Sequence, residues 1–191
     1  MFNEILIKEM RANSITELDL KEKRLGVEGG MVVAGLLPVM GSLRVTNLLR
    51  NELFAESAKM LSEVAKQNGI SLCGIQRDQT TADFTRQGLK PPDAILLASD
   101  LSQVVVTGAL TSLDLRENRL CGLNEHGNGT YTADGITAIA DALRVNGSLT
   151  SLNLSKNLLC GVSIWGGTYN TEGITAIADA LRVNGVLTKV R

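Results

Sequence analysis

The feature that constrains the fold most is a thirteen-residue segment that occurs twice without a single change. Residues 135–147 and residues 173–185 both read GITAIADALRVNG. Two related blocks precede them: residues 110–122 read LTSLDLRENRLCG, and residues 149–161 read LTSLNLSKNLLCG. Both blocks follow the pattern LxxLxLxxNxL. Such repeats predict similar units packed against one another, because one unit of this size cannot bury its apolar face alone.

Each unit is predicted to form a strand, a turn, a helix and a return. In the LxL part, the two leucines point to one face of a short strand and the residue between them points to the other. The asparagine turns the chain, because its amide can bond nearby backbone groups. Helical spacing follows, at Ile136, Ile139, Ala140 and Leu143. The Asn-Gly pairs at 146–147 and 184–185 predict helix ends with a left-handed glycine.

Weaker copies of the pattern occur nearer the N-terminus. Residues 15–25 and 43–53 follow it, and residues 82–89 form a degenerate copy. Residues 69–81 lose the pattern and predict an irregular insertion. We expect one domain over residues 1–191, with an N-terminal capping helix at 1–14 and the most regular repeats at 82–191. The predicted strands lie near residues 15–20, 45–48, 82–84, 111–115 and 150–154, and at 188–190.

On these blocks, the sequence resembles the ribonuclease inhibitor-like class of leucine-rich repeat proteins. The resemblance implies an α/β solenoid of about five repeats, with a curved parallel sheet on the concave face and helices on the convex face. The last repeats begin 39 and 38 residues apart, whereas leucine-rich repeats span roughly 20–29 residues. The two enlarged C-terminal repeats therefore carry inserted loops between strand and helix, at residues 121–135 and 160–173.

Composition and charge argue against several classes of function. Lysine plus arginine number 19 and aspartate plus glutamate 20, so no excess positive charge attracts nucleic acid or an anionic membrane. The longest stretch without charge covers residues 29–43, which is shorter than the roughly 20 apolar residues of a membrane span. Three cysteines and one histidine fit neither a disulfide scaffold nor a zinc site. We expect a cytoplasmic protein with no metal and no cofactor.

Two features are candidates for binding. Polar residues alternate with the leucines and predict an uncovered sheet face, which is either a solvated surface or a docking surface. The inserted loops hold the single tryptophan, the single histidine and both tyrosines, and these rings either cover the helix ends or contact a partner. The candidate partner-binding residues are Asp114, Arg116, Glu117, Asn153, Ser155, Lys156, Tyr131, Trp165 and Tyr169.

No nucleophile or acid–base pair is recognisable, so we predict no catalytic residue and a protein that is not an enzyme. The leading hypothesis is a protein–protein interaction scaffold that binds another protein, with no nucleic-acid or membrane partner. A GTPase-regulating role is one alternative, because Ran GTPase-activating proteins share this repeat class. A recognition segment of a larger receptor or sensor is another, and self-association through the C-terminal repeat stays open.

Cys121 and Cys160 hold equivalent positions in adjacent repeats. Neighbouring strands lie about 4.8 Å apart, so a disulfide between them is geometrically possible. We nevertheless expect free thiols, because the expected compartment is reducing and a small apolar cysteine packs well.

Overall fold

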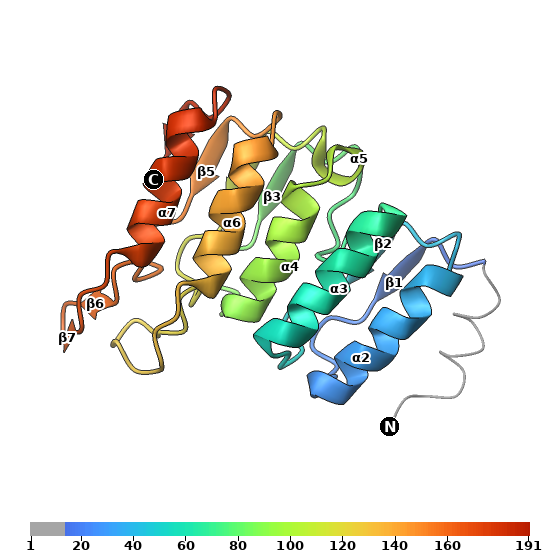
Figure 1. Cartoon of the computed structure of the whole chain (residues 1–191), viewed down its shortest axis with the longest axis horizontal. Helices are drawn as coiled ribbons and strands as arrows, with labels where there is room; N and C mark the ends of the chain where they lie inside the picture. Colours follow the sequence, from blue (N-terminus) through green and yellow to red (C-terminus); the bar gives the residue numbers. More distant parts are fainter. Residues whose placement is uncertain (1–13) are drawn as a thin grey trace.

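The computed structural model describes residues 14–191, in which short strands alternate with helices along the chain (Figure 1). The main strands are β1 (Glu17–Asp19), β2 (Val45–Asn47), β3 (Thr81–Asp83), β4 (Ser112–Asp114), β5 (Ser151–Asn153) and β8 (Lys189–Val190). The longer helices are α2 (Gly26–Leu36), α3 (Ala55–Asn68), α4 (Pro91–Leu101), α6 (Asp134–Val145) and α7 (Glu172–Val183). Shorter elements are a 3₁₀ turn (Leu37–Val39), α5 (Val104–Thr107), β6 (Val162–Ser163) and β7 (Gly166–Gly167). The predicted strand positions are confirmed. The capping helix predicted at residues 1–14 lies outside the described residues except for residue 14, which is not helical.

The longer helices lie side by side in one layer, in chain order from α2 to α7, and the main strands lie behind them (Figure 1). In residues 14–191, no helix lies on the other face of these strands. No helix in this part of the chain combines the length and apolar character needed to cross a membrane.

The predicted solenoid with one curved parallel sheet is wrong. The structure is α/β, but its described strands form three small sheets of two, four and two strands. β1 and β2 form a parallel pair, and β3, β4, β5 and β8 form a parallel sheet in that order. β6 and β7 form an antiparallel hairpin. The strands therefore do not join into one repeat sheet.

The division between the first two sheets lies at residues 71–73, inside the segment that we expected to be an irregular insertion. Ser71 and Cys73 make only isolated bridges to β2. The amides of Leu72 and Cys73 donate to the buried carboxylate of Asp100, at 2.8 Å and 3.0 Å. Because a side chain takes these donors, they do not extend a ladder to a further strand. Residues 74–80 then lead to β3, which pairs with β4.

The core follows the leucine pattern. Leu113, Leu115, Leu152 and Leu154 are buried, as predicted. The apolar stripe of α6 is also buried and packs toward the strands, as its spacing predicted. Nearly all of this core is aliphatic, so its stability depends on many small contacts rather than on a few large rings.

Buried asparagines join each unit to the one before it, which confirms their predicted structural role. The Nδ2 group of Asn157 donates to the carbonyl oxygens of Leu115 and Leu154, both at 2.9 Å. Asn118 bonds the carbonyls of Phe84 and Leu115 in the same way. These bonds fix the spacing between neighbouring turns.

The predicted left-handed glycines at the ends of α6 and α7 are wrong. Asn146 has an extended backbone (φ −75°, ψ 118°), and neither Gly147 nor Gly185 has a positive φ. The Asn146 side chain ends the helix instead. Its Oδ1 atom accepts the amide of Leu149 at 2.8 Å, and its Nδ2 group donates to the carbonyl of Leu101 at 2.8 Å.

Candidate functional site

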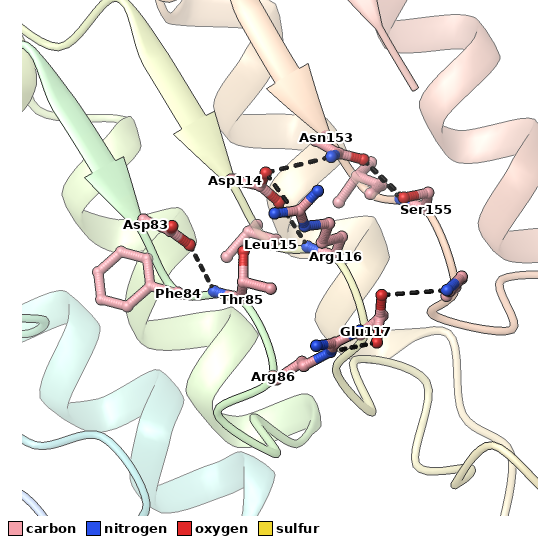
Figure 2. Close-up of polar contacts among 12 residues, drawn as sticks. Asp83, Phe84, Thr85, Arg86, Asp114, Leu115, Arg116, Glu117, Asn153 and Ser155 are labelled. Atoms are coloured by element: carbon pink, nitrogen blue, oxygen red, sulfur yellow. Dashed lines mark hydrogen bonds and ion pairs between the residues drawn. The ribbon is translucent and has the colours of Figure 1, made fainter.

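A row of polar side chains runs across the open face of the four-stranded sheet. Asp83, Asp114 and Asn153 occupy the same register position in β3, β4 and β5. Adjacent strands lie about 4.8 Å apart, so these side chains are neighbours. Asn153 Nδ2 donates to Asp114 Oδ2 at 3.2 Å, as Figure 2 shows. Asp114 and Asn153 are therefore bonded to each other across the two strands, and Asp83 extends the row on β3.

The same three side chains cap the turns that follow their strands. Asp83 Oδ1 accepts the amide of Thr85 at 2.8 Å, Asp114 Oδ1 that of Arg116 at 3.0 Å, and Asn153 Oδ1 that of Ser155 at 3.1 Å (Figure 2). Hydrogen bonds from Thr85 hold the pKa of Asp83 below its usual value. Local bonds of this kind fix the backbone of a turn.

A second row, which we call the charge ladder, crosses the three turns beyond the strands. It consists of Arg86, Glu117 and Lys156, which have left-handed backbones with φ of 56°, 57° and 59°. Glu117 accepts a hydrogen bond from the Arg86 guanidinium and another from the Lys156 ammonium at 3.1 Å. These partners, Arg86 first, lower the pKa of Glu117 to about 2. Glu117 is therefore ionised at neutral pH, and the charge ladder alternates in sign.

The charge ladder borders a pocket of about 380 Å³. Its lining residues are Arg86, Gly88, Glu117, Asn118, Arg119, Glu125 and Lys156. A second pocket of about 260 Å³ shares Gly88 and Arg119 with it and extends toward Arg50 and Lys90. Both pockets offer charged groups of both signs. They suit carboxylate, ammonium and amide groups of a polypeptide better than an apolar ligand.

An exposed apolar tip lies near this pocket. The β6–β7 hairpin carries Ile164 and Trp165 in its two-residue loop, and these side chains are 92% and 70% exposed. The ring of Trp165 lies 6.3 Å from that of His126. His126 follows Glu125, which lines the larger pocket. The inserted loops thus connect the pocket to a large exposed aromatic ring.

The two tyrosines hold equivalent sequence positions but lie in different surroundings. Tyr131 is half-buried and donates its hydroxyl to the carbonyl of Leu159 at 2.9 Å. Tyr169 is exposed. Tyr131 therefore packs against the repeat that follows it, whereas no described residue lies at the equivalent place for Tyr169 to pack on.

Six of the predicted binding residues come together on β4, β5 and the turns after them: Asp114, Arg116, Glu117, Asn153, Ser155 and Lys156. Trp165 lies apart on the hairpin, and Tyr131 contacts the repeat after its own. Sequence reasoning missed Arg86, Arg119, Glu125 and Ile164. Arg86 could have been found, because it precedes its unit's glycine turn as Glu117 and Lys156 precede their asparagines.

The cysteines and acidic residues offer no sign of metal or redox chemistry in the described chain. All three cysteines are free thiols, and Cys73 and Cys121 are buried. Burial raises the pKa of Cys121 to about 12 and that of Cys73 well above its usual value. Within residues 14–191, no cluster of three or more His, Cys, Asp or Glu side chains could hold a metal ion.

No protein-family model matches this chain, and a search of the curated proteins found no match.

Proposed function

We propose that this protein is a non-catalytic interaction protein that binds another protein through the open face of β3, β4 and β5 and the charge ladder at its border. The observation that carries the proposal is the bonded polar network on an uncovered sheet face. Asp114 alone pairs with Arg116 at 3.5 Å and accepts from Asn153 at 3.2 Å. Side chains already held in place lose less conformational entropy on binding.

The charges of this surface favour a protein over a polyanion. Arg86 and Lys156 share Glu117 as their ion-pair partner, and Arg116 pairs with Asp114, so three cations face two carboxylates in these contacts. Nucleic-acid binding depends on several unmatched cations that contact phosphates. A mixed surface instead selects a partner with complementary charges of both signs.

Ile164 and Trp165 supply the large apolar side chains that the polar network lacks. Most binding energy in protein interfaces comes from a few large side chains that become buried, and tryptophan is prominent among them. These two residues stand at the tip of a hairpin beside the loop that lines the larger pocket. A partner that spans the charge ladder and the hairpin tip would bury both kinds of group.

The test is affinity capture with quantitative mass spectrometry, using the wild type and matched variants. Trp165→Ala and Arg116→Ala should each lose the same captured protein while the melting temperature stays nearly unchanged, because both side chains are exposed. The control is the double variant Asp141→Lys with Arg144→Glu on α6, which reverses an existing ion pair on the helix layer. It should retain the protein.

The reverse pattern would contradict the proposal. If the α6 double variant loses the captured protein and the other two variants keep it, the helix layer is the binding surface. If the captured protein is a GTPase whose GTP hydrolysis the chain accelerates, a GTPase-regulating function replaces the scaffold function.

A further inference from the structure

The two identical segments, residues 135–147 and 173–185, differ in how much of their apolar surface is exposed to solvent. In α6, an apolar face is buried and consists of Ile136, Ala140 and Leu143. The same face in α7 consists of Ile174, Ala178 and Leu181. Ile174 is 45% exposed, Ala178 is exposed and Leu181 is half-buried. Sequence cannot account for the difference, so the neighbours must.

The neighbour that covers α6 is α7 itself. A Cβ atom added to Gly173 would lie 2.8 Å from Cγ2 of Ile136, so the backbone of α7 rests directly on this face. In the described chain, no element rests on the equivalent face of α7 (Figure 1). We call the set Ile174, Ala178, Leu181 and Val190 the terminal face.

Among the described strands, the sheet also has an unpaired edge beside α7, and this edge is β8. β8 pairs with β5 on one side and with no described strand on the other. Val190 is 38% exposed, whereas its register partner Leu152 is 1% exposed. Unpaired strand edges join readily with another strand. An apolar helix face and a free strand edge thus lie together.

The terminal face fits a second copy of itself. Ala178 lies between the larger Ile174 and Leu181 on the same side of α7. When two such helices pack antiparallel about a two-fold axis at Ala178, Ile174 of each copy meets Leu181 of the other. The small alanines at the centre allow a close approach.

Charge and strand geometry agree with that arrangement. Glu172 lies in the first turn of α7 and Arg182 in the last, so an antiparallel pair brings opposite charges and opposite helix-dipole ends together. A two-fold axis perpendicular to the sheet also places the two β8 edges antiparallel, which is a hydrogen-bonding orientation. One symmetry operation therefore serves both layers.

We propose that the terminal face is the interface of a symmetric homodimer, formed by antiparallel packing of α7 on α7 and of β8 on β8. The face of α7 that forms this interface is the equivalent of the face of α6 that α7 covers within the chain. It lies at one end of the helix row and leaves the charge ladder free. The dimer is independent of the function proposed above.

The first test measures molar mass by light scattering over a concentration series. The wild type should reach twice the chain mass. Ile174→Glu and Leu181→Glu should raise the dimer dissociation constant by roughly tenfold or more, because each places a charge in the contact. Val183→Glu is the control on the same helix, since Val183 and its equivalent Val145 are both exposed and so lie off the packing face.

A wild type that stays monomeric up to the highest concentration would overturn the proposal, and so would a dimer that survives both glutamate variants. Circular dichroism of each variant separates loss of the dimer from loss of the fold. A dimer weakened equally by Val183→Glu would place the contact elsewhere on α7.

The second test addresses the symmetry. In Ala178→Cys, a two-fold axis at this residue brings the two new thiols together, so mild oxidation should yield a disulfide-linked dimer. Val183→Cys and the oxidised wild type are the controls and should stay unlinked. A head-to-tail contact, in which α7 of one copy packs on α2 of the next, would leave Ala178→Cys unlinked and give larger assemblies.

Discussion

Asp100 Oδ1 accepts the backbone amide of Leu72 at 2.8 Å and thereby joins the end of α4 to a segment 28 residues earlier in the chain. Its second oxygen accepts the amide of Cys73 at 3.0 Å and the hydroxyl of Ser71 at 2.8 Å. The carboxylate is fully buried. One side chain therefore satisfies the backbone groups at the place where the sheet is divided.

This carboxyl should make stability depend on pH in an unusual direction. Burial raises the pKa of Asp100 to about 7, although its three hydrogen-bond donors favour the charged form. In the unfolded chain, its pKa is about 3.9. Between these values the folded state binds more protons than the unfolded state, so the contribution of Asp100 to stability falls as the pH rises from about 4 to 7.

Urea unfolding at several pH values tests this with Asp100→Asn. The variant should be about 1–3 kcal/mol less stable at pH 5, because at this pH the wild-type carboxyl is stabilised by taking up a proton on folding and an amide cannot take one up. The deficit should shrink toward pH 7. The exposed Asp141→Asn is the control and should keep the wild-type pH profile. Parallel profiles for the wild type and Asp100→Asn would contradict the prediction.

The charge ladder predicts a second titration. Carbon-detected NMR should give Glu117 a pKa of about 2, since Arg86 and Lys156 both bond its carboxylate. Arg86→Ala should raise this pKa more than Lys156→Ala does, because the Arg86 hydrogen bond is the larger cause. The folded pKa is depressed, so the stabilisation exists above the unfolded pKa of about 4.3 and is lost as the pH falls toward 2. An ordinary pKa for Glu117 would mean that the charge ladder does not form in solution.

A core prediction concerns Leu152, which is 1% exposed in β5. Leu152→Ala should cost about 2–5 kcal/mol of unfolding free energy, from lost burial and from the cavity left behind. Ser151→Ala is the matched control, because the neighbouring side chain points to the open face, and it should change stability by less than about 0.5 kcal/mol. Equal losses in chemical denaturation would mean that the buried and open faces are misassigned.

Alkylation followed by mass spectrometry can rank the three thiols by how fast they react. In the folded protein, the half-buried Cys160 should react first, whereas Cys73 and Cys121 should be protected by burial and by raised pKa values. Denatured protein that has not been reduced should take up three labels. Only one label on the denatured protein would reveal a disulfide.

Strand positions could be predicted from the sequence because each depends on a local pattern. Leu113 and Leu115 mark β4 by their alternation, and Leu152 and Leu154 mark β5 in the same way. The division of the sheet could not be predicted from the sequence, because it depends on hydrogen bonds that Asp100 accepts from amides 27 and 28 residues earlier in the chain. A buried aspartate near the end of an apolar helix gives no local sign of its target.

Only part of the candidate site could be predicted from the sequence, for the same reason. Asp114 and Asn153 were predictable from the residues between the leucines, and their pairing follows from strand register. Arg86 was harder to recognise, because its unit has Ala82, Phe84 and Gln87 where the later units have two leucines and an asparagine. The exposure of Ile164 depends on how the β6–β7 hairpin projects, and no periodic pattern encodes that.

The identity of α6 and α7 also creates a choice during folding. The site on α4 that receives α6 is shaped for Gly135, where an added Cβ would lie 2.9 Å from the Cβ of Ala94. Residues 173–185, most of which form α7, begin with the equivalent glycine and have the same sequence, so they would fit that site equally well. Only the connecting chain distinguishes them, because the shorter loop from β4 makes closure with α6 less costly in entropy. A chain in which α7 docks first would leave α6 looped out, so correct assembly depends on loop length rather than on side-chain recognition.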